Sequence, residues 1–97
     1  MNYGPEGKDV PKLESQFTPQ FLEELDYWQE TRPEIAQRID SLLEAVLNDP
    51  FRGIGKPELL RFGKLKGCWS RRITKEHRLI YSIERSTITF LQCRYHY

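Results

Sequence analysis

The sequence predicts an α+β fold in which an N-terminal helical hairpin packs on a twisted antiparallel sheet. Apolar residues recur at helical spacing between residues 18 and 50, and strand-like runs joined by short turns follow residue 67. The chain has only 97 residues, so residues 1–97 are expected to form a single domain with no separate cofactor domain.

The N-terminal segment has the composition of a loose tail. Residues 1–12 are polar, contain two glycines and two prolines, and show no periodicity, so we expect a tail over residues 1–13. A short run from Leu13 to Phe17 is interpreted as a first strand. The segment lacks the apolar core of a secretory signal, and no apolar run is long enough to span a membrane. We therefore expect a cytoplasmic protein.

Two helix starts follow directly. Thr18 is a typical N-cap and Pro19 a typical first helical residue. Thr31 and Glu34 have the spacing of a capping box, which predicts a second helix with Thr31 as its N-cap. That helix is expected to end at Asn48-Asp49-Pro50. The apolar stripes of the two helices are Phe21, Leu22, Leu25 and Trp28, and then Ile35, Ile39, Leu42, Leu43 and Val46.

The second half predicts a meander of strands. Residues 51–67 are rich in glycine and are expected to form a loop. Three strands are predicted after it, from Cys68 to Thr74, from His77 to Ile83 and from Thr87 to Tyr95. The connecting turns are so short that neighbouring strands must be antiparallel.

Charge is divided unequally between the two halves. The formal net charge is +1, but residues 1–50 carry four basic and eleven acidic side chains, a net of −7. Residues 51–97 carry eleven basic and three acidic side chains, a net of +8. Such asymmetry indicates a nucleic-acid partner, although two solvated faces of opposite sign would look the same.

The two cysteines predict neither a disulfide nor a metal site. Cys68 and Cys93 are not in a CxxC pair, and no His or Cys lies at ligand spacing from them. Both are interpreted as buried free thiols in a reducing compartment. No GxGxxG, P-loop or GxSxG motif is present, and we expect no metal or cofactor.

The basic half contains the groups that RNA cleavage by transesterification requires. In that reaction a base takes the proton of the ribose 2′-OH, and an acid protonates the 5′-oxygen that leaves. Guanidinium groups stabilise the negative phosphorane, and aromatic rings stack on unpaired bases. The residues that could converge on one sheet face are Lys56, Glu58, Trp69, Arg71, Arg72, Arg78, His96 and Tyr97.

Each of these residues also has a structural interpretation. Glu58 can be a solvated ion-pair partner, and Arg78 can belong to a cross-strand charge pair. Side chains alternate along a strand, so at most one of Arg71 and Arg72 can face a site on a given side. Further structural interpretations place Trp69 and Tyr81 in the core, make His77 structural or solvated, and leave His96 in a frayed terminus. The residues alone indicate a small α+β domain with an RNA-binding face as one option.

Four segments of the chain resemble the YoeB (Txe) toxins of the RelE-like superfamily. The resemblance covers about residues 14–97, and the string WSRRITxEHRLxY with a terminal RYHY carries most of its specificity. The matching segments are YWQET at 27–31, PFRGIGKPE at 50–58, GCWSRRITKEHRLIY at 67–81 and CRYHY at 93–97.

The resemblance implies the toxin of a type II toxin–antitoxin system. Such a toxin is a ribosome-dependent mRNA endonuclease, an mRNA interferase, which cuts the codon in the ribosomal A site and stops translation. An antitoxin of the YefM (Phd-like) class wraps the toxin, and the complex binds operator DNA through the antitoxin. The resemblance also implies a homodimer.

The family's site residues carry over one by one. Glu58 matches the general base, Arg78 the guanidinium that stabilises the transition-state phosphate, and His96 the general acid. Tyr97 matches the terminal tyrosine that orients the substrate. Arg61 stands where the family usually has Lys, which keeps the charge but changes the geometry of a phosphate contact. The expected substrate-binding residues are Lys56, Arg61, Arg72 and Tyr97.

Two other functions stay open on the sequence. A non-catalytic RNA- or ribosome-binding domain would need the basic charge but neither Glu58 nor His96. A protein-interaction module would instead bind a basic partner through the acidic helices.

Overall fold

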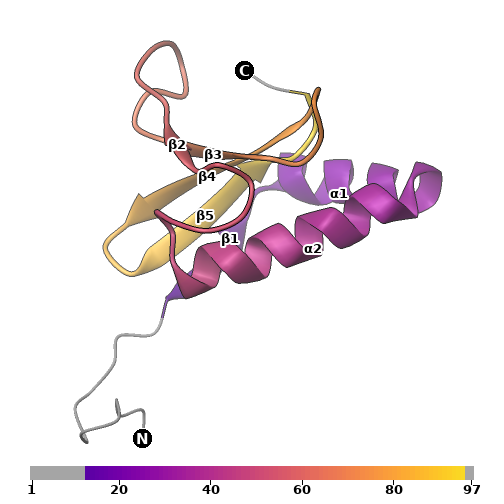
Figure 1. Ribbon diagram of the computed structural model, residues 1–97, viewed down its shortest axis with the longest axis horizontal. Helices are drawn as coiled ribbons and strands as arrows, with labels where there is room; N and C mark the ends of the chain where they lie inside the picture. Colours follow the sequence, from indigo (N-terminus) through magenta and orange to yellow (C-terminus); the bar gives the residue numbers. More distant parts are fainter. Residues whose placement is uncertain (1–12, 96–97) are drawn as a thin grey trace, which may run out of the picture.

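The computed structural model describes residues 13–95 and has two helices packed on a five-stranded sheet (Figure 1). The predictions for the tail before residue 13 and for His96 and Tyr97 lie outside the described residues. The strand order is β1-β5-β4-β3-β2. The elements are β1 (Glu14–Phe17), α1 (Pro19–Thr31), α2 (Pro33–Asn48), β2 (Glu58–Leu59), β3 (Trp69–Arg72), β4 (Arg78–Glu84) and β5 (Thr87–Gln92).

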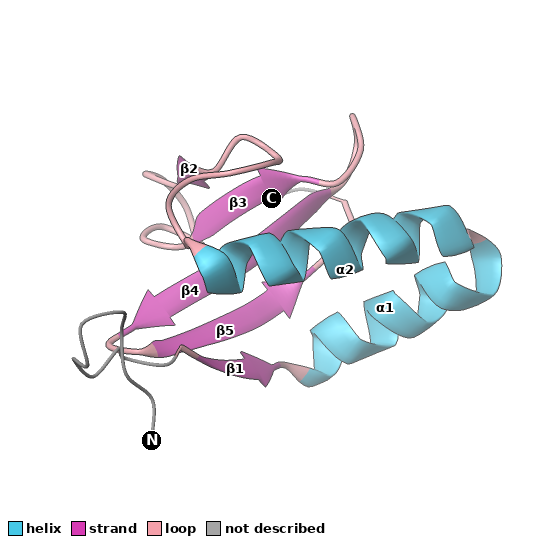
Figure 2. Cartoon of the chain, turned by 60° about the horizontal axis from the view of Figure 1, so that its bottom comes forward, coloured by secondary structure: helices cyan, strands magenta, loops and turns pink. Residues whose placement is uncertain are grey.

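Both helices cover the same face of the sheet, so the predicted α+β architecture is confirmed (Figure 2). Trp69 and Tyr81 face this layer, which confirms their core interpretation. Neither helix in residues 13–95 has the length and apolarity needed to cross a membrane. The buried core consists of Phe21, Trp28, Ile35, Ala36, Ile39, Leu42, Val46, Ile73, Leu79, Tyr81, Ile88, Phe90 and Cys93.

The sheet differs from the predicted meander at its two edges. β1 pairs with β5 in parallel, from Glu14 opposite Thr87 to Phe17 opposite Phe90. A parallel pair needs a long crossover, which here includes both helices and the other strands. At the opposite edge, β2 lies inside the segment that was predicted to be loop, and it pairs antiparallel with β3. A two-residue strand has no periodicity of its own, so the prediction missed it.

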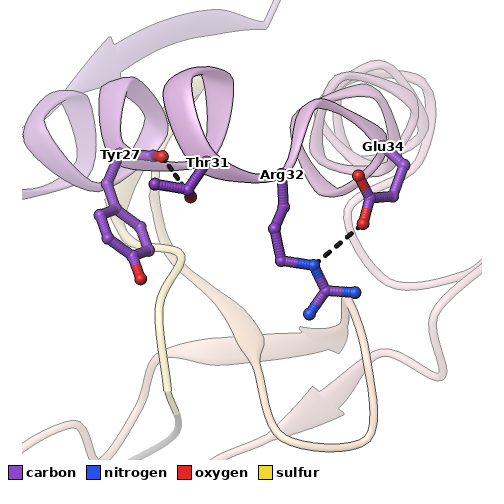
Figure 3. A network of polar contacts seen from close by, with 4 residues as sticks. All are labelled: Tyr27, Thr31, Arg32 and Glu34. Atoms are coloured by element: carbon purple, nitrogen blue, oxygen red, sulfur yellow. Dashed lines mark hydrogen bonds and ion pairs between the residues drawn. The ribbon is translucent and has the colours of Figure 1, made fainter.

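The junction between the helices corrects the predicted capping box (Figure 3). Thr31 is the last residue of α1, and its hydroxyl donates to the carbonyl of Tyr27 at 2.6 Å. Arg32 is the N-cap of α2, because Pro33 disfavours helical geometry in the residue before it. Glu34 accepts a hydrogen bond from Nε of Arg32 at 2.9 Å. The prediction for Thr18 is confirmed, since its hydroxyl accepts from the amide of Phe21 at 3.0 Å.

Candidate active site

The sheet face opposite the helices brings together three of the five predicted catalytic and substrate-binding residues that lie within residues 13–95. Directly opposed residues of neighbouring strands point to the same face, as do residues two apart on one strand. Glu58 opposes Ser70, and Ser70 opposes Ile80. Arg72 opposes Arg78, each two positions from that row. Glu58, Arg72 and Arg78 therefore share the face that carries no helix, which we call the open face, on which Ser70 and Ile80 are buried. Leu79 and Tyr81 point toward the helices.

The spacing on this face suits one phosphodiester. Glu58 lies on β2 and Arg78 on β4, with β3 between them, and Arg78 is two residues along β4 from the position level with Glu58. Standard strand spacings give about 12 Å between the Cα atoms of Glu58 and Arg78. Two long side chains that approach from opposite sides of such a gap can both contact a group between them. The arrangement fits a base and a phosphate-binding cation that act on the same nucleotide.

Arg72 and Arg78 form a directly opposed pair of like charge. This corrects the interpretation of Arg78 as part of a cross-strand ion pair, because its partner across the ladder is also a cation. Arg78 is half-buried, and its Nη1 donates to the carbonyls of Thr74 at 3.2 Å and of Lys75 and His77 at 3.4 Å. These acceptors orient the guanidinium without neutralising it, so the pair is suited to bind an anion.

Glu58 lies at the edge of this face beside a hollow. Its side chain is exposed, and within residues 13–95 the only salt bridge joins Arg32 and Glu34. The structure therefore gives no support to Glu58 as an ion-pair partner among the described residues. The hollow has a volume of about 340 Å³ and is lined by Glu58, Leu59, Leu60, Arg61 and Phe62.

Phe62 is a candidate that the sequence analysis missed. Its side chain is 86% exposed, the highest value among the large apolar residues described. It lines both the hollow at Glu58 and a second hollow of about 380 Å³ that reaches Gln92. The available signal was a phenylalanine between Arg61 and Gly63 in a basic loop. An exposed ring beside a carboxylate and a cation can stack on a base.

The loop before Glu58 is anchored by Arg71, whose side chain is fully buried. Its guanidinium donates to the carbonyls of Asp49 at 2.5 Å, Arg52 at 2.9 Å and Ile54 at 3.1 Å. It also donates to the hydroxyl of Tyr81 at 3.0 Å. Arg71 is thus structural, and Arg72 is the member of the pair on the open face, as strand alternation requires.

Gly55 and Lys56 fix the last turn of this loop. Gly55 has φ +86°, and a Cβ there would lie 2.9 Å from Cδ2 of Leu42 and 3.0 Å from Cβ of Arg71. Its carbonyl accepts from the amide of Arg72 at 2.6 Å. Lys56 is exposed with φ +51°, a conformation that non-glycine residues adopt only where their surroundings enforce it. Gly55 and Lys56 therefore define the backbone of the turn that leads to Glu58.

The C-terminal segment up to Tyr95 is held by α1 and by Arg78. The carbonyl of Cys93 accepts from Nε1 of Trp28 at 2.9 Å, and its amide donates to Oε1 of Glu24 at 2.7 Å. The carbonyl of Tyr95 accepts from the amide of Arg78 at 3.0 Å. The described chain therefore ends beside Arg78, the candidate phosphate-binding residue.

Both cysteines are free, as predicted, but only Cys93 is buried. Cys68 is half-buried, which corrects its interpretation as a buried thiol. Burial raises the pKa of the Cys93 thiol strongly, and the nearby carboxylate of Glu24 adds to the shift. Burial also raises the pKa of the Cys68 thiol. Both thiols are therefore protonated at neutral pH.

Comparison with known proteins identifies the family. The family described as "YoeB-like toxin of bacterial type II toxin-antitoxin system" matches residues 17–97. The chain belongs to the YoeB family of toxins. Toxin YoeB of Escherichia coli K12 is 48% identical over 71 residues, which are 73% of this chain and 83% of that YoeB. Toxin RelK of Mycobacterium tuberculosis H37Rv is 46% identical over 81 residues, covering 84% of this chain and 94% of RelK.

Solved structures of YoeB toxins share the fold. The YoeB/ParE toxin from Agrobacterium tumefaciens is 37% identical with a TM-score of 0.81, over 88% of this chain and all of that one. The heterotetrameric YoeB-YefM complex from Staphylococcus aureus contains a chain that is 38% identical with a TM-score of 0.76, over 88% and 98%. A structure described as a YoeB dimer from the same organism is 38% identical with a TM-score of 0.78, over 89% and 99%.

Proposed function

We propose that this YoeB-family toxin is a ribosome-dependent mRNA endonuclease that cleaves mRNA in the ribosomal A site. The observation that carries the proposal is the open sheet face, where Glu58 and the opposed cations Arg72 and Arg78 lie at a spacing suited to one phosphodiester. Similarity to YoeB toxins over residues 17–97 supports the same activity.

The proposed reaction is an internal transesterification. Glu58 takes the proton of the ribose 2′-OH, and the 2′-oxygen attacks the adjacent phosphorus. The P–O5′ bond breaks, and His96 donates a proton to the leaving 5′-oxygen. The products are a 2′,3′-cyclic phosphate, or the 3′-phosphate formed from it, and a 5′-hydroxyl. An ordinary Glu has a pKa near 4.3 and is a weak base for a 2′-OH, so positioning on the ribosome supplies much of the rate.

The cations and aromatic residues bind the substrate in this scheme. Arg78 stabilises the extra negative charge of the phosphorane, and Arg72 contacts the same anion from the opposite strand. Arg61, which lines the hollow beside Glu58, and the exposed Lys56 contact neighbouring phosphates. Tyr97 orients the nucleotide. We assign His96 and Tyr97 on the resemblance of the terminal RYHY to the family.

The proposed partners follow from the relatives. The YoeB of Staphylococcus aureus has been solved both in complex with YefM and as a dimer. We infer that this toxin also binds an antitoxin of the YefM class and forms a homodimer. Operator DNA is contacted only through the antitoxin. The toxin acts in the cytoplasm, where its ribosome and mRNA are found.

The test is cleavage of a defined mRNA in a purified translation system, with the cut site and end groups mapped. The wild type is expected to cut within the A-site codon and to leave a cyclic or 3′-phosphate. Glu58→Gln and His96→Gln should each lower the rate by about 10² to 10⁴, the usual contribution of one proton-transfer group. Glu84→Gln is the matched control, because Glu84 is an exposed carboxylate at the far end of β4.

Two results would contradict the proposal. One is wild-type protein that leaves the mRNA on translating ribosomes intact. The other is translation inhibition by Glu58→Gln and His96→Gln equal to that of the wild type. The second result would indicate a non-catalytic ribosome-binding domain.

A further inference from the structure

We propose that His77 is a positioning residue for the C-terminal proton donor. Its Nδ1 accepts a hydrogen bond of 2.6 Å from the amide of Tyr95, the residue directly before His96. This inference rests on the proposed function, in which His96 is the general acid. From the sequence, His77 is interpreted as structural or solvated, and the structure places it in a buried position with 8% exposure.

Tyr95 has a backbone conformation that needs external support. Its φ is +60°, in the left-handed region, where a non-glycine residue is strained. Such a conformation persists only where the surroundings enforce it. A change of φ at Tyr95 would redirect the chain that follows, and His96 is the next residue.

Two consecutive residues hold both polar backbone groups of Tyr95. Nδ1 of His77 accepts from its amide, and the amide of Arg78 donates to its carbonyl at 3.0 Å. Arg78 also carries the guanidinium assigned to the phosphate. The same dipeptide therefore sets the end of the described chain relative to the phosphate-binding cation.

The ring of His77 is itself fixed from two sides. It packs edge-on against the ring of Trp28 with 4.6 Å between centroids, and against the ring of Tyr95 at 5.1 Å. An Nδ1 that accepts a hydrogen bond carries no proton, so the neutral ring has its proton on Nε2. The side chain thus combines an aromatic contact with one directed acceptor.

The backbone of His77 is held independently of its side chain. Its carbonyl accepts from the amides of Ile73 at 2.9 Å and Thr74 at 3.2 Å. Its amide donates to the hydroxyl of Thr74 at 3.1 Å. A side-chain substitution at His77 therefore leaves these backbone hydrogen bonds of the turn in place.

A pair of substitutions separates the acceptor from the ring. His77→Phe keeps the ring against Trp28 and Tyr95 but removes Nδ1. His77→Asn loses the ring but keeps an amide oxygen near the position of Nδ1. A displacement of about 1 Å at a reacting group lowers a rate by about 10²-fold. We expect H77F to lower kcat by about 10- to 100-fold with little change in KM, and H77N to retain most of the rate.

Amide hydrogen exchange supplies a second readout that does not depend on activity. In 15N-labelled full-length protein, the Tyr95 amide should exchange at least about 10-fold faster in H77F than in the wild type and H77N. The amide of Cys93, which donates to Glu24, serves as the internal control and should be unchanged. If H77F does not fold, H77Q replaces it, because the Gln amide reaches the position of Nε2 and not that of Nδ1.

The outcomes separate this inference from the proposed function. An active wild type with an equally active H77F, or with unchanged Tyr95 exchange, overturns the positioning role and leaves the endonuclease proposal intact. Equal losses in H77F and H77N, with Cys93 exchange also raised, indicate a structural role and overturn it as well. An inactive wild type overturns the proposed function and this inference together.

Discussion

Replacing Arg71 by Met tests whether one buried guanidinium organises the loop that presents Glu58. The substitution keeps the apolar stem and removes the charged head. The head donates to three carbonyls of the loop and to the hydroxyl of Tyr81. The hydroxyl of Tyr81 donates in turn to the carbonyl of Pro50 at 2.7 Å.

The expected cost follows from the four acceptors that lose their donor. Each buried acceptor left without a partner costs about 1 to 3 kcal/mol, although water reaches some of these carbonyls once the loop loosens. Hydrogen bonds to a charged donor contribute about 1.5 to 3 kcal/mol each, so loss of two or more of them should cost at least about 3 kcal/mol. A domain of this size has about 5 to 15 kcal/mol of stability in total. The midpoint of thermal unfolding should therefore fall by at least about 12 °C.

Urea and thermal unfolding, followed by circular dichroism, measure this loss. Arg72→Met is the matched control, because Arg72 is the adjacent residue of the same strand and is exposed. It should change stability by less than about 0.5 kcal/mol while lowering RNA cleavage. An Arg71→Met protein within about 1 kcal/mol of the wild type would refute the anchoring role, as would an equal loss in Arg72→Met.

Four further predictions concern the exposed Phe62, the two thiols, and the residues Thr31 and Glu34 at the helix junction. Phe62→Ala should leave the unfolding free energy within about 0.5 kcal/mol of the wild type, because the side chain is largely exposed. Phe62→Ala should lower RNA cleavage by about 5- to 150-fold if the ring stacks on a base, and Phe62→Trp should restore cleavage. Equal cleavage by Phe62→Ala and the wild type would exclude stacking. Iodoacetamide should label the half-buried Cys68 in the folded protein, but Cys93 only after unfolding. Mass spectrometry measures the labelling, and labelling of Cys93 in the folded protein would contradict its burial. Thr31→Ala should cost less than about 0.5 kcal/mol in urea unfolding, whereas loss of a true N-cap costs about 1 kcal/mol. Hydrogen bonds from the backbone amide of Glu34 and from the side chain of Arg32 hold the pKa of Glu34 below its usual value. The ionised carboxylate of Glu34 therefore stabilises the fold above its ordinary pKa, and this contribution is lost as the pH falls through the folded-state pKa. The free energy of unfolding of Glu34→Gln should accordingly change slightly less than that of the wild type between about pH 7 and pH 3.

Local patterns predicted the elements whose signals are themselves local. The apolar periodicity defined both helices, and Thr18-Pro19 marked the start of α1 correctly. The capping box failed because two local signals competed: Pro33 set the start of α2 and excluded Thr31 from its cap. The parallel pairing of β1 with β5 had no local signal, since it depends on residues more than 70 positions apart.

The site likewise combines features that local sequence signals predict with features that depend on long-range strand pairing. Residue type and the family resemblance selected Glu58, Arg72 and Arg78, and the structure places all three on one face. Their common face depends on β2, a strand of two residues that only the ladder with β3 defines. The structural role of Arg71 could not be predicted for a different reason. Its burial depends on carbonyls of a loop that the sequence does not reveal as acceptors.

The position of β5 has a consequence for the order in which the molecule forms. β5 lies between β1 and β4, and Thr18 at the start of α1 donates to the carbonyl of Leu91, 73 residues later. Because β5 separates β1 from β4, the sheet can be completed only after residues 87–92 have been synthesised. The contacts of the helical hairpin are local in sequence, whereas those that join β1 to β5 close a loop of more than 70 residues. We therefore expect the hairpin to form early and the sheet to limit the folding rate.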